Sequence, residues 1–401
     1  MNILVIGNGF DLAHGLPTKY GDFLQFVKVI NQVVEVNNQQ DWEAVHWSGL
    51  HPEIIRFIIE VVDSKRENWS VVEKWRELIK DNFWFKYFDQ CDMHGNENWI
   101  DFESEIAQVI ESITDRMERD GYNLYSLEPC IKKKYLNEYE SKYKVVMKII
   151  DNLTENKNEI RFIDMRNMLE KDLNRLIRAL EWYLCEYIDK MEIRMKSNDI
   201  DSINADCVLS FNYTNTFSRL YQVKQKIGEK DADLFDYIHG VADINKELED
   251  NNMVLGIDEY LSDDRKNKDV EFIIFKKYYQ RIFKGTGCKY KDWTDEIKES
   301  RKTTEIGLRD EYPAQIPFQK FTSRHYIYIF GHSLDVTDKD IMKDLILNDN
   351  VYTIIYYYNK NDLRTKIANL VKVIGQDELI RRTGGSTKTI EFKLQKDMAK
   401  I

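Results

Sequence analysis

The sequence predicts an α/β protein with a mainly parallel sheet and a large helical insertion. A short apolar run at the start, Ile3–Ile6, ends at Gly7-Asn8-Gly9 and is typical of a buried strand followed by a tight turn. Apolar residues then recur at helical spacing up to about residue 198. From residue 200 onward, β-prone runs alternate with helical stretches, which indicates a parallel sheet covered on both faces.

The strand candidates share apolar or β-branched residues and are followed by turn residues. They are residues 3–6, 207–211, 235–238, 326–330, 351–358 and 389–394. Helical stretches separate several of them. We therefore expect one discontinuous α/β domain built from residues 1–40 and 200–401.

The spacing of apolar residues predicts an all-helical insertion domain over residues 41–199. Leu169, Leu173, Leu176 and Leu180 recur at the spacing of one helix face, among many charged residues. Asp101, at the start of one of these helices, can cap it through its carboxylate. The alternative is that the carboxylates near this helix start point into a cleft.

Composition narrows the class of protein. The 401 residues are 43% hydrophobic and 32% charged, with a net charge of −11, so we expect no stable nucleic-acid partner. Five cysteines without C-x-x-C spacing predict neither a disulfide framework nor a zinc module, and fit a cytoplasmic protein. No run is long enough to span a membrane, no basic leader is present, and no spacing is typical of a metal site. We therefore expect no membrane span, no signal peptide and no bound metal.

Polar turns follow four of the predicted strands: Gly7-Asn8-Gly9, Asn212, His239 and Gly331-His332-Ser333. The carboxyl ends of parallel strands share one edge of a sheet, where ligands bind, so these turns predict a nucleotide site. Glycines let the backbone approach a phosphate, and a side chain at Gly9 would then block binding. Gly15 follows six residues later rather than three, so the ordinary dinucleotide fingerprint is absent and a plain tight turn is the alternative.

Four segments resemble the AbiH family of bacteriophage abortive-infection proteins. They are IGNGFDLAHGLPTKY, NWIDFE, VLSFNYTNTF and IFGHSLDVTDKDI. Together they extend from about Gly7 to about Asp340. The resemblance covers most of the chain and implies a role in bacterial defence against phage.

The same turns are similar, more distantly, to sirtuin-type NAD-binding domains. The matching positions keep their order along the chain and are Gly7, Gly9, Gly15, Leu16, Pro17, Ser210–Asn212, Ile238–Gly240 and Gly331–Val336. This resemblance implies a Rossmann-like (sirtuin-like) sheet with NAD lying across the strand ends. Since no four-cysteine zinc module is present, the resemblance points to the NAD-consuming defence proteins rather than to the protein deacylases.

Three positions depart from the sirtuin pattern. Tyr20 stands where sirtuins carry an arginine, Phe211 where they carry a glutamine and Thr214 where they carry an aspartate. These differences leave the orientation of nicotinamide and the contacts to the ribose open.

The resemblance assigns catalytic roles to His239 and Asn212. We expect NAD to be bound by the matching turns and the residues beside them: Gly7, Asn8, Gly9, Phe10, Asp11, Gly15, Pro17, Tyr213, Gly331, His332 and Ser333. The alternatives are a packed or exposed histidine for His239 and an Asx turn for Asn212. His332 matches a threonine that contacts the nucleotide, and His14 could serve only to pack or cap the first helix.

We therefore expect an enzyme that hydrolyses NAD to nicotinamide and ADP-ribose, without a metal. One alternative is another nucleotide hydrolase or nucleotidyl transferase that uses the same pocket. The other is a non-catalytic sensor that binds NAD or ADP-ribose, with the helical insertion meeting a phage-derived trigger or a second copy of the chain.

Overall fold

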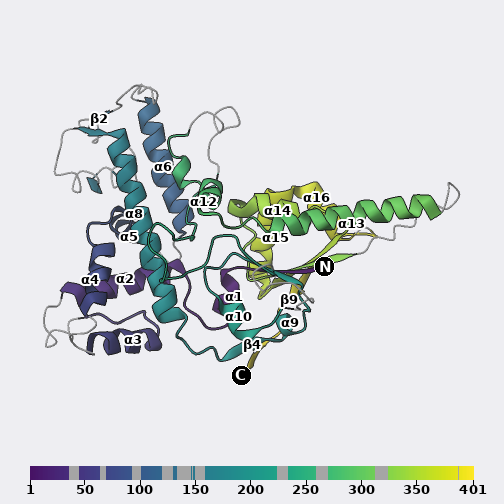
Figure 1. Cartoon of the computed structure of the whole chain (residues 1–401), viewed down its shortest axis with the longest axis horizontal. Helices are drawn as coiled ribbons and strands as arrows, with labels where there is room; N and C mark the ends of the chain where they lie inside the picture. Colours follow the sequence, from purple (N-terminus) through teal and green to yellow (C-terminus); the bar gives the residue numbers. More distant parts are fainter. Residues whose placement is uncertain are drawn as a thin grey trace. The chain divides into compact units, whose positions relative to one another are not determined.

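Two compact units make up the chain in the computed structural model (Figure 1). The α/β unit comprises Met1–Leu16, Glu192–Val241 and Gly285–Ile401, and the helical unit comprises Pro17–Met191 and Ala242–Lys284. The structure describes residues 1–35, 45–63, 69–92, 101–119, 130–132, 146, 148–149, 159–223, 234–258, 270–311, 324–386 and 388–401. The chain therefore passes between the units four times.

The boundaries of the units differ from the domain boundaries expected from the sequence. Residues 17–40 and 242–284, which we assigned to the α/β domain, are grouped with the helices where they are described. Helix α2 (Tyr20–Glu35) shows why, because the Phe26 ring lies 4.9 Å from the rings of both Trp75 and Tyr183. Aromatic burial against other helices thus places α2 in the helical unit.

A six-stranded parallel sheet forms the centre of the α/β unit. Its strands are β1 (Asn2–Ile6), β5 (Cys207–Ser210), β6 (Phe235–Tyr237), β7 (His325–Phe330), β8 (Val351–Tyr357) and β9 (Ile390–Leu394). Each coincides with one of the six predicted runs to within one or two residues. The predicted fold class, α/β with a mainly parallel sheet, is confirmed.

The order of the strands is β6-β5-β1-β7-β8-β9. Numbered along the chain within this sheet, that is 3-2-1-4-5-6, the order of a doubly wound Rossmann-type sheet. Ile3 pairs with Cys207 on one side and Ile327 on the other, so β1 is a central strand. The strand order reverses between β1 and β7, and ligands bind at the carboxyl ends of such a switch point.

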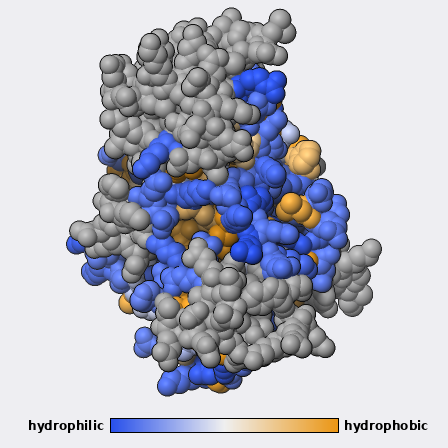
Figure 2. Space-filling model, turned by 90° about the vertical axis from the view of Figure 1, so that its left-hand side faces the viewer, coloured by the Kyte–Doolittle hydropathy of each residue, from blue (hydrophilic) through white to orange (hydrophobic). Residues whose placement is uncertain are grey.

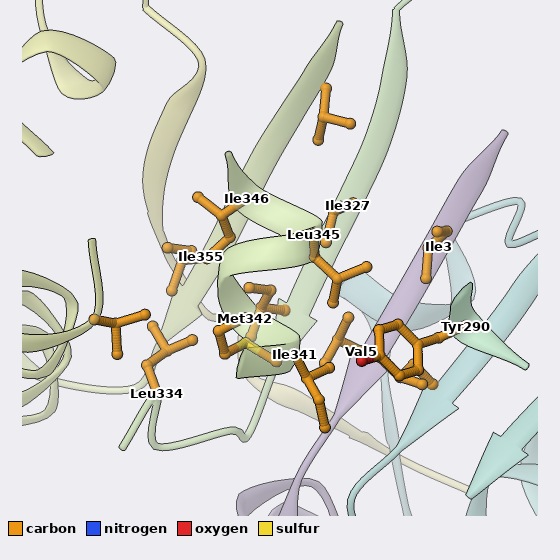
Figure 3. Packing of buried hydrophobic residues seen from close by; sticks show 14 of the residues in the cluster. Ile3, Val5, Tyr290, Ile327, Leu334, Ile341, Met342, Leu345, Ile346 and Ile355 are labelled. Atoms are coloured by element: carbon orange, nitrogen blue, oxygen red, sulfur yellow. The ribbon is translucent and has the colours of Figure 1, made fainter. Parts of the chain in front are cut away.

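Helices α13 (Tyr290–Glu311), α14 (Lys339–Ile346), α15 (Lys360–Ile374) and α16 (Gln376–Thr383) supply the apolar residues that cover one face of the sheet. Figure 3 shows Ile341, Met342 and Leu345 of α14 directed at the strands that carry Val5 and Ile327. All five side chains are fully buried. Alternate residues of β1 point to this face, as the period of two along a strand requires.

Shorter helices cover the opposite face: α1 (Asn8–Ala13), α9 (Asn198–Asp201) and α10 (Thr216–Leu220). Leu4 and Ile6 of β1 pack there against Phe10, Phe217 and Tyr221. In Figure 1, α14 to α16 and the pair α1 and α10 lie on opposite sides of the sheet. Phe10, at the start of α1, therefore belongs to the core of the unit.

Small antiparallel pairs stand outside the central sheet. Strand β2 (Cys130–Lys132) pairs with β3 (Glu159–Arg161), and β4 (Met195–Ser197) pairs with β10 (Met398–Lys400). Three of these strands lie within residues 41–199, so that segment is not all helical as predicted. They are short, and helical periodicity in the neighbouring residues hides them.

The helical unit contains a cluster of aromatic rings that includes the fully buried Phe102. Its helices are α2, α3 (Pro52–Asp63), α4 (Trp69–Ile79), α5 (Phe83–Asp92), α6 (Phe102–Arg119), α8 (Phe162–Tyr183), which continues into η3 (Leu184–Ile188), and α12 (Lys277–Lys284), preceded by η4 (Ile273–Phe275). The Phe102 ring stacks on Tyr20 at 4.2 Å and on Phe88 at 4.5 Å. Asp101 accepts hydrogen bonds from the Glu103 N–H and the Ser104 hydroxyl, which confirms that it caps α6.

Candidate active site at the sheet edge

The loops that follow β1 and β7 meet at the switch point of the sheet. The Gly7 N–H donates to the Phe330 carbonyl at 3.2 Å, and the Gly9 N–H donates to the Gly331 carbonyl at 2.8 Å. The Phe10 N–H donates to the Gly7 carbonyl at 2.8 Å. These three N–H groups are thus used within the fold.

Close approach of the two backbones explains the glycines. A β-carbon on Gly9 would lie 2.8 Å from the Cα and carbonyl oxygen of Gly331. A β-carbon on Gly331, whose φ is +71°, would lie 2.1 Å from the Phe10 nitrogen. A β-carbon on Gly7 would likewise lie 2.8 Å from the Cα of His332. The glycines thus let the two loops approach each other, and their contact with a ligand stays a prediction.

Helix α1 connects this turn to the loop after β5. Asp11 is buried, and its Oδ2 accepts a hydrogen bond from the Thr214 hydroxyl at 2.6 Å. The Thr216 hydroxyl in turn bonds to Thr214 at 3.1 Å. Asp11 therefore holds the loop that carries Asn212 and Tyr213.

His14, at the end of α1, has a structural role. Its Nδ1 donates to the Phe10 carbonyl at 2.7 Å, and its Nε2 accepts from the Tyr221 hydroxyl at 2.8 Å. Burial lowers the pKa of His14 below its usual value, which the bond to Phe10 opposes. The packing role considered from the sequence is confirmed.

Three predicted ligand residues lie apart from these contacts. The Asn8 side chain is exposed at the start of α1, and Gly15 is exposed with a φ of +82°. Pro17 belongs to the helical unit, where its carbonyl accepts a hydrogen bond from the Tyr183 hydroxyl at 2.7 Å.

Asn212 presents a buried amide at the carboxyl end of β5. Its backbone N–H donates to the Ser210 hydroxyl at 3.1 Å, which closes a tight turn. The side chain is 5% exposed, yet neither its Oδ1 nor its Nδ2 has a hydrogen-bond partner among the described residues. A buried amide without a partner costs about 1–3 kcal/mol, so such a group is expected to meet a ligand or a water molecule.

His239 occupies the equivalent position after β6 and is 6% exposed. Its ring lies 5.6 Å from the ring of Phe211 and 6.2 Å from that of Tyr213. The Phe211 ring also lies 4.2 Å from that of His332. The structure thus gathers the turns after β5, β6 and β7 around Phe211.

The segment between α12 and α13 supports the end of β6. The Thr286 hydroxyl donates to the Tyr237 carbonyl at 2.9 Å. Gly287, with a φ of +70°, leaves no room for a β-carbon, which would lie 2.6 Å from the Ile238 carbonyl oxygen. The backbone before His239 is therefore fixed from outside the sheet.

The Asp338 carboxylate lies close to both histidines and was not predicted from the sequence. Its Oδ1 lies 3.3 Å from Nε2 of His239, and its Oδ2 lies 3.5 Å from Nε2 of His332. All three residues are less than 8% exposed. Asp338 ends η5 (Val336–Asp338), where α14 begins, inside the segment GHSLDVTD that we had singled out only for His332 and its neighbours.

Helix α15 fixes the loop that carries His332. Lys366 donates to the His332 carbonyl at 2.7 Å, and Asn369 donates to the Ser333 carbonyl at 3.0 Å. Burial lowers the pKa of Lys366, which the neighbouring Asp362 opposes. The Ser333 side chain is exposed.

A cleft lies in the helical unit, among α2, α4 and α5. This cleft has a volume of about 650 Å3 and is lined by Leu24, Val27, Lys28, Asn31, Gln32, Arg76, Ile79, Lys80, Asp81, Phe85, Lys86, Phe88 and Asp89. Figure 2 shows the face of the molecule that lies on the left in Figure 1, where α2, α4 and α5 are found. On this face, hydrophobic surface is bordered by hydrophilic residues. No residue of the predicted nucleotide site lines this cleft.

Across the described part of the chain, no three His, Cys, Asp or Glu side chains are grouped as a metal site would require. None of the described helices is both long and apolar enough to cross a membrane.

Comparison with known proteins gives the family. No curated protein matches the sequence. The family described as "Bacteriophage abortive infection AbiH" matches residues 3–358, which include the turns after β1, β5, β6 and β7. The match covers nearly the whole chain, and the chain therefore belongs to the AbiH family of bacteriophage abortive-infection proteins.

Proposed function

We propose that this protein contributes to phage defence by hydrolysing NAD to nicotinamide and ADP-ribose at the carboxyl edge of its parallel sheet. Family membership supports the defence role. The strand order supports a nucleotide at the switch point. The order of turns along the chain, which resembles that of sirtuin-type domains, supports NAD as the nucleotide.

One observation carries the proposal: the buried Asn212 amide, with both polar atoms lacking a partner among the described residues. An amide can both donate to and accept from ribose hydroxyls or a water molecule. It is also neutral, so it can orient a substrate whose ribose becomes positively charged without adding a charge of its own.

The chemistry requires little covalent participation from the protein. The bond between the ribose C1′ and the nicotinamide nitrogen breaks, and its electron pair neutralises the pyridinium ring. The oxygen of a water molecule bonds to C1′, and a proton of that water passes to His239 and then to solvent. Holding the ribose and the water in place reduces the entropic part of the barrier, and a histidine exchanges protons near neutral pH.

Two substitutions test the proposal. His239→Ala and Asn212→Ala should each lower the kcat for NAD at least about a hundredfold, because general-base catalysis and positioning contribute factors of about 10² to 10⁴. Both variants should still bind ADP-ribose in calorimetry. Asn245→Ala changes an exposed asparagine of the helical unit and is the matched control, with an unchanged rate.

Release of nicotinamide is measured by chromatography, with purified protein and in phage-challenged cells. Stabilisation of the protein by NAD without release in either setting would replace this proposal with the sensor alternative. Turnover of a different nucleotide, lost in the same two variants, would point to another hydrolase or transferase activity at this site.

A further inference from the structure

We propose that the outer edge of strand β9 is a docking surface for a second copy of this chain, whose own β9 pairs with it antiparallel around a two-fold axis. Strand β9 is the last strand of the sheet and is hydrogen-bonded to β8 on one side. Pairing on its other side joins two six-stranded sheets into one. This pairing does not depend on the chemistry proposed for the sheet edge.

Alternate residues of β9 turn their backbone groups away from β8. The Thr389 carbonyl accepts a hydrogen bond from β8 at 2.8 Å, and the Gln395 N–H donates one to β8 at 2.8 Å. Odd-numbered residues of β9 therefore face β8, since successive residues of a strand alternate in direction. The even-numbered residues point outward, and no hydrogen bond to their N–H groups is shown among the described residues; they are Ile390, Phe392 and Leu394.

The two edges of the sheet differ in how they are covered. At the β6 edge, the Thr286 hydroxyl donates to the Tyr237 carbonyl at 2.9 Å. At the β9 edge, the chain instead continues towards α9, where the Lys396 N–H donates to the Asp199 carboxylate at 2.7 Å. Within the described part of the chain, the outer edge of β9 is therefore open, and an open edge is a template for another strand.

The sequence of β9, IEFKL, is complementary to itself when it is reversed. A two-fold axis at Phe392 places this residue opposite the partner's Phe392, and Ile390 opposite the partner's Leu394. These residues have the outward backbone groups, so each such pair can exchange both of its N–H···O bonds. Glu391 then lies opposite the partner's Lys393, at positions where facing side chains come closer together.

Charge disfavours the two neighbouring registers. An axis at Glu391 would place two carboxylates directly opposite each other, and an axis at Lys393 would do the same with two ammonium groups. Like charges in directly opposite positions destabilise a strand pair. Larger shifts leave fewer residues paired, so the axis at Phe392 is the register that the sequence of β9 favours.

Contacts with β8 hold the two charged side chains on one face of the sheet. Oε2 of Glu391 accepts a hydrogen bond from the Tyr352 hydroxyl at 2.7 Å. The Lys393 ammonium lies 5.5 Å from the centre of the Tyr356 ring. Both charges are therefore fixed beside the open edge, where each can meet the opposite charge of a second copy.

Apolar surface gathers in the same part of the α/β unit. Helix α16 lies beside β9, because the Thr389 N–H donates to the Arg382 carbonyl at 2.8 Å. Leu394 is 55% exposed on β9, and Ile380 is 62% exposed on α16. Among the described residues of this unit, the exposed large hydrophobic ones all follow α14; they are Leu347, Tyr358, Ile367, Val371, Ile380, Leu394 and Ile401. A symmetric contact through one such patch on both copies closes a dimer.

Sedimentation velocity of the full chain over a concentration series tests the pairing. We expect the wild type to have twice the mass of one chain. Lys393→Glu and Glu391→Lys should each raise the dissociation constant of the dimer at least about tenfold, because each places two pairs of like charges opposite each other. The double variant Glu391→Lys/Lys393→Glu restores opposite charges in both pairs and should form the dimer again.

A second variant tests the backbone rather than the charges. Leu394→Pro removes an N–H that points away from β8, so the bonds to β8 remain while pairing with a second copy is lost. Lys343→Glu reverses an exposed charge on α14 and is the matched control, with an unchanged dissociation constant. Circular dichroism of each variant checks its folding.

The possible results separate clearly. A wild type with the mass of one chain at every concentration would overturn the proposal, and this measurement needs no variant to fold. A dimer that neither single charge reversal weakens would place the contact elsewhere and would also overturn it. A double variant as weak as the single ones would contradict the register centred on Phe392.

Discussion

Gly9 and Gly331 lie where two loops meet with no room for a side chain. A β-carbon on Gly9 would stand 2.8 Å from backbone atoms of Gly331, which cannot rotate away as a side chain could. Gly9→Ala should therefore lower the free energy of unfolding by about 1–3 kcal/mol, the usual cost of overpacking. Urea denaturation measures it.

Gly384→Ala is the control for this prediction. Gly384 has a φ of −126°, and its nearest neighbour to a new β-carbon is the Ile380 carbonyl oxygen at 3.5 Å, an ordinary contact. Its effect should stay within about 0.5 kcal/mol. If Gly9→Ala were as stable as Gly384→Ala, the result would contradict the close contact between the loops that carry Gly9 and Gly331.

His14 makes the stability of the protein depend on pH. Burial lowers its folded-state pKa below the value of about 6.5 that it has in an unfolded chain. As the pH falls through 6.5, the unfolded chain binds a proton that the folded protein does not, so the free energy of unfolding should decrease. Burial and the N-terminal ammonium also lower the pKa of His325, so this histidine has the same effect on stability.

Urea denaturation at pH 7.5 and at pH 5.5 should show this decrease, and it should be smaller in His14→Gln. A decrease as large as that of the wild type would show that His14 does not contribute. His325→Gln, which removes a further buried imidazole with a lowered pKa, should reduce the decrease independently.

The site residues show what the sequence can and cannot predict. Asn212 and His239 were predicted because each follows a strand, and position after a strand fixes position at the sheet edge. Asp338 follows no strand; a short helical turn brings it to the histidines from eight residues beyond Phe330. Similarly, Gly9 and Gly331 are far apart in sequence, so their mutual contact could not be predicted from either loop alone.

Among the helices, α6 shows how one side chain can join two neighbouring helices. Phe102 is fully buried and stacks between rings from α2 and α5. Phe102→Ala should lower the free energy of unfolding by about 3–5 kcal/mol through lost burial and the cavity left behind. The change is measured by urea denaturation.

Phe283→Ala removes the same side chain from a position that is 75% exposed on α12 in the same unit. Its effect should remain within about 0.5 kcal/mol. Equal effects of the two substitutions would mean that Phe102 does not hold α2, α5 and α6 together.

The strands were predicted more accurately than the boundaries of the two units. A buried parallel strand is a short apolar run whatever its neighbours, so all six were visible in the sequence. Grouping of helices depends on which faces meet, and that information is spread over distant residues. For this reason α2 and the residues around α12 were assigned to the α/β domain, whereas the structure groups them with the other helices.

The interleaving of the two units also sets the order in which the protein can fold during its synthesis. Strand β1 leaves the ribosome first, but its neighbours β5 and β7 begin at Cys207 and His325. At about 5–20 residues per second, β1 waits about 10–40 s for β5 and longer for β7. The helical unit also remains incomplete until Lys284 is made. In a nascent chain the central strand thus stays unpaired until β5 has been made, and the sheet edge that would carry the site closes only after β7 has emerged.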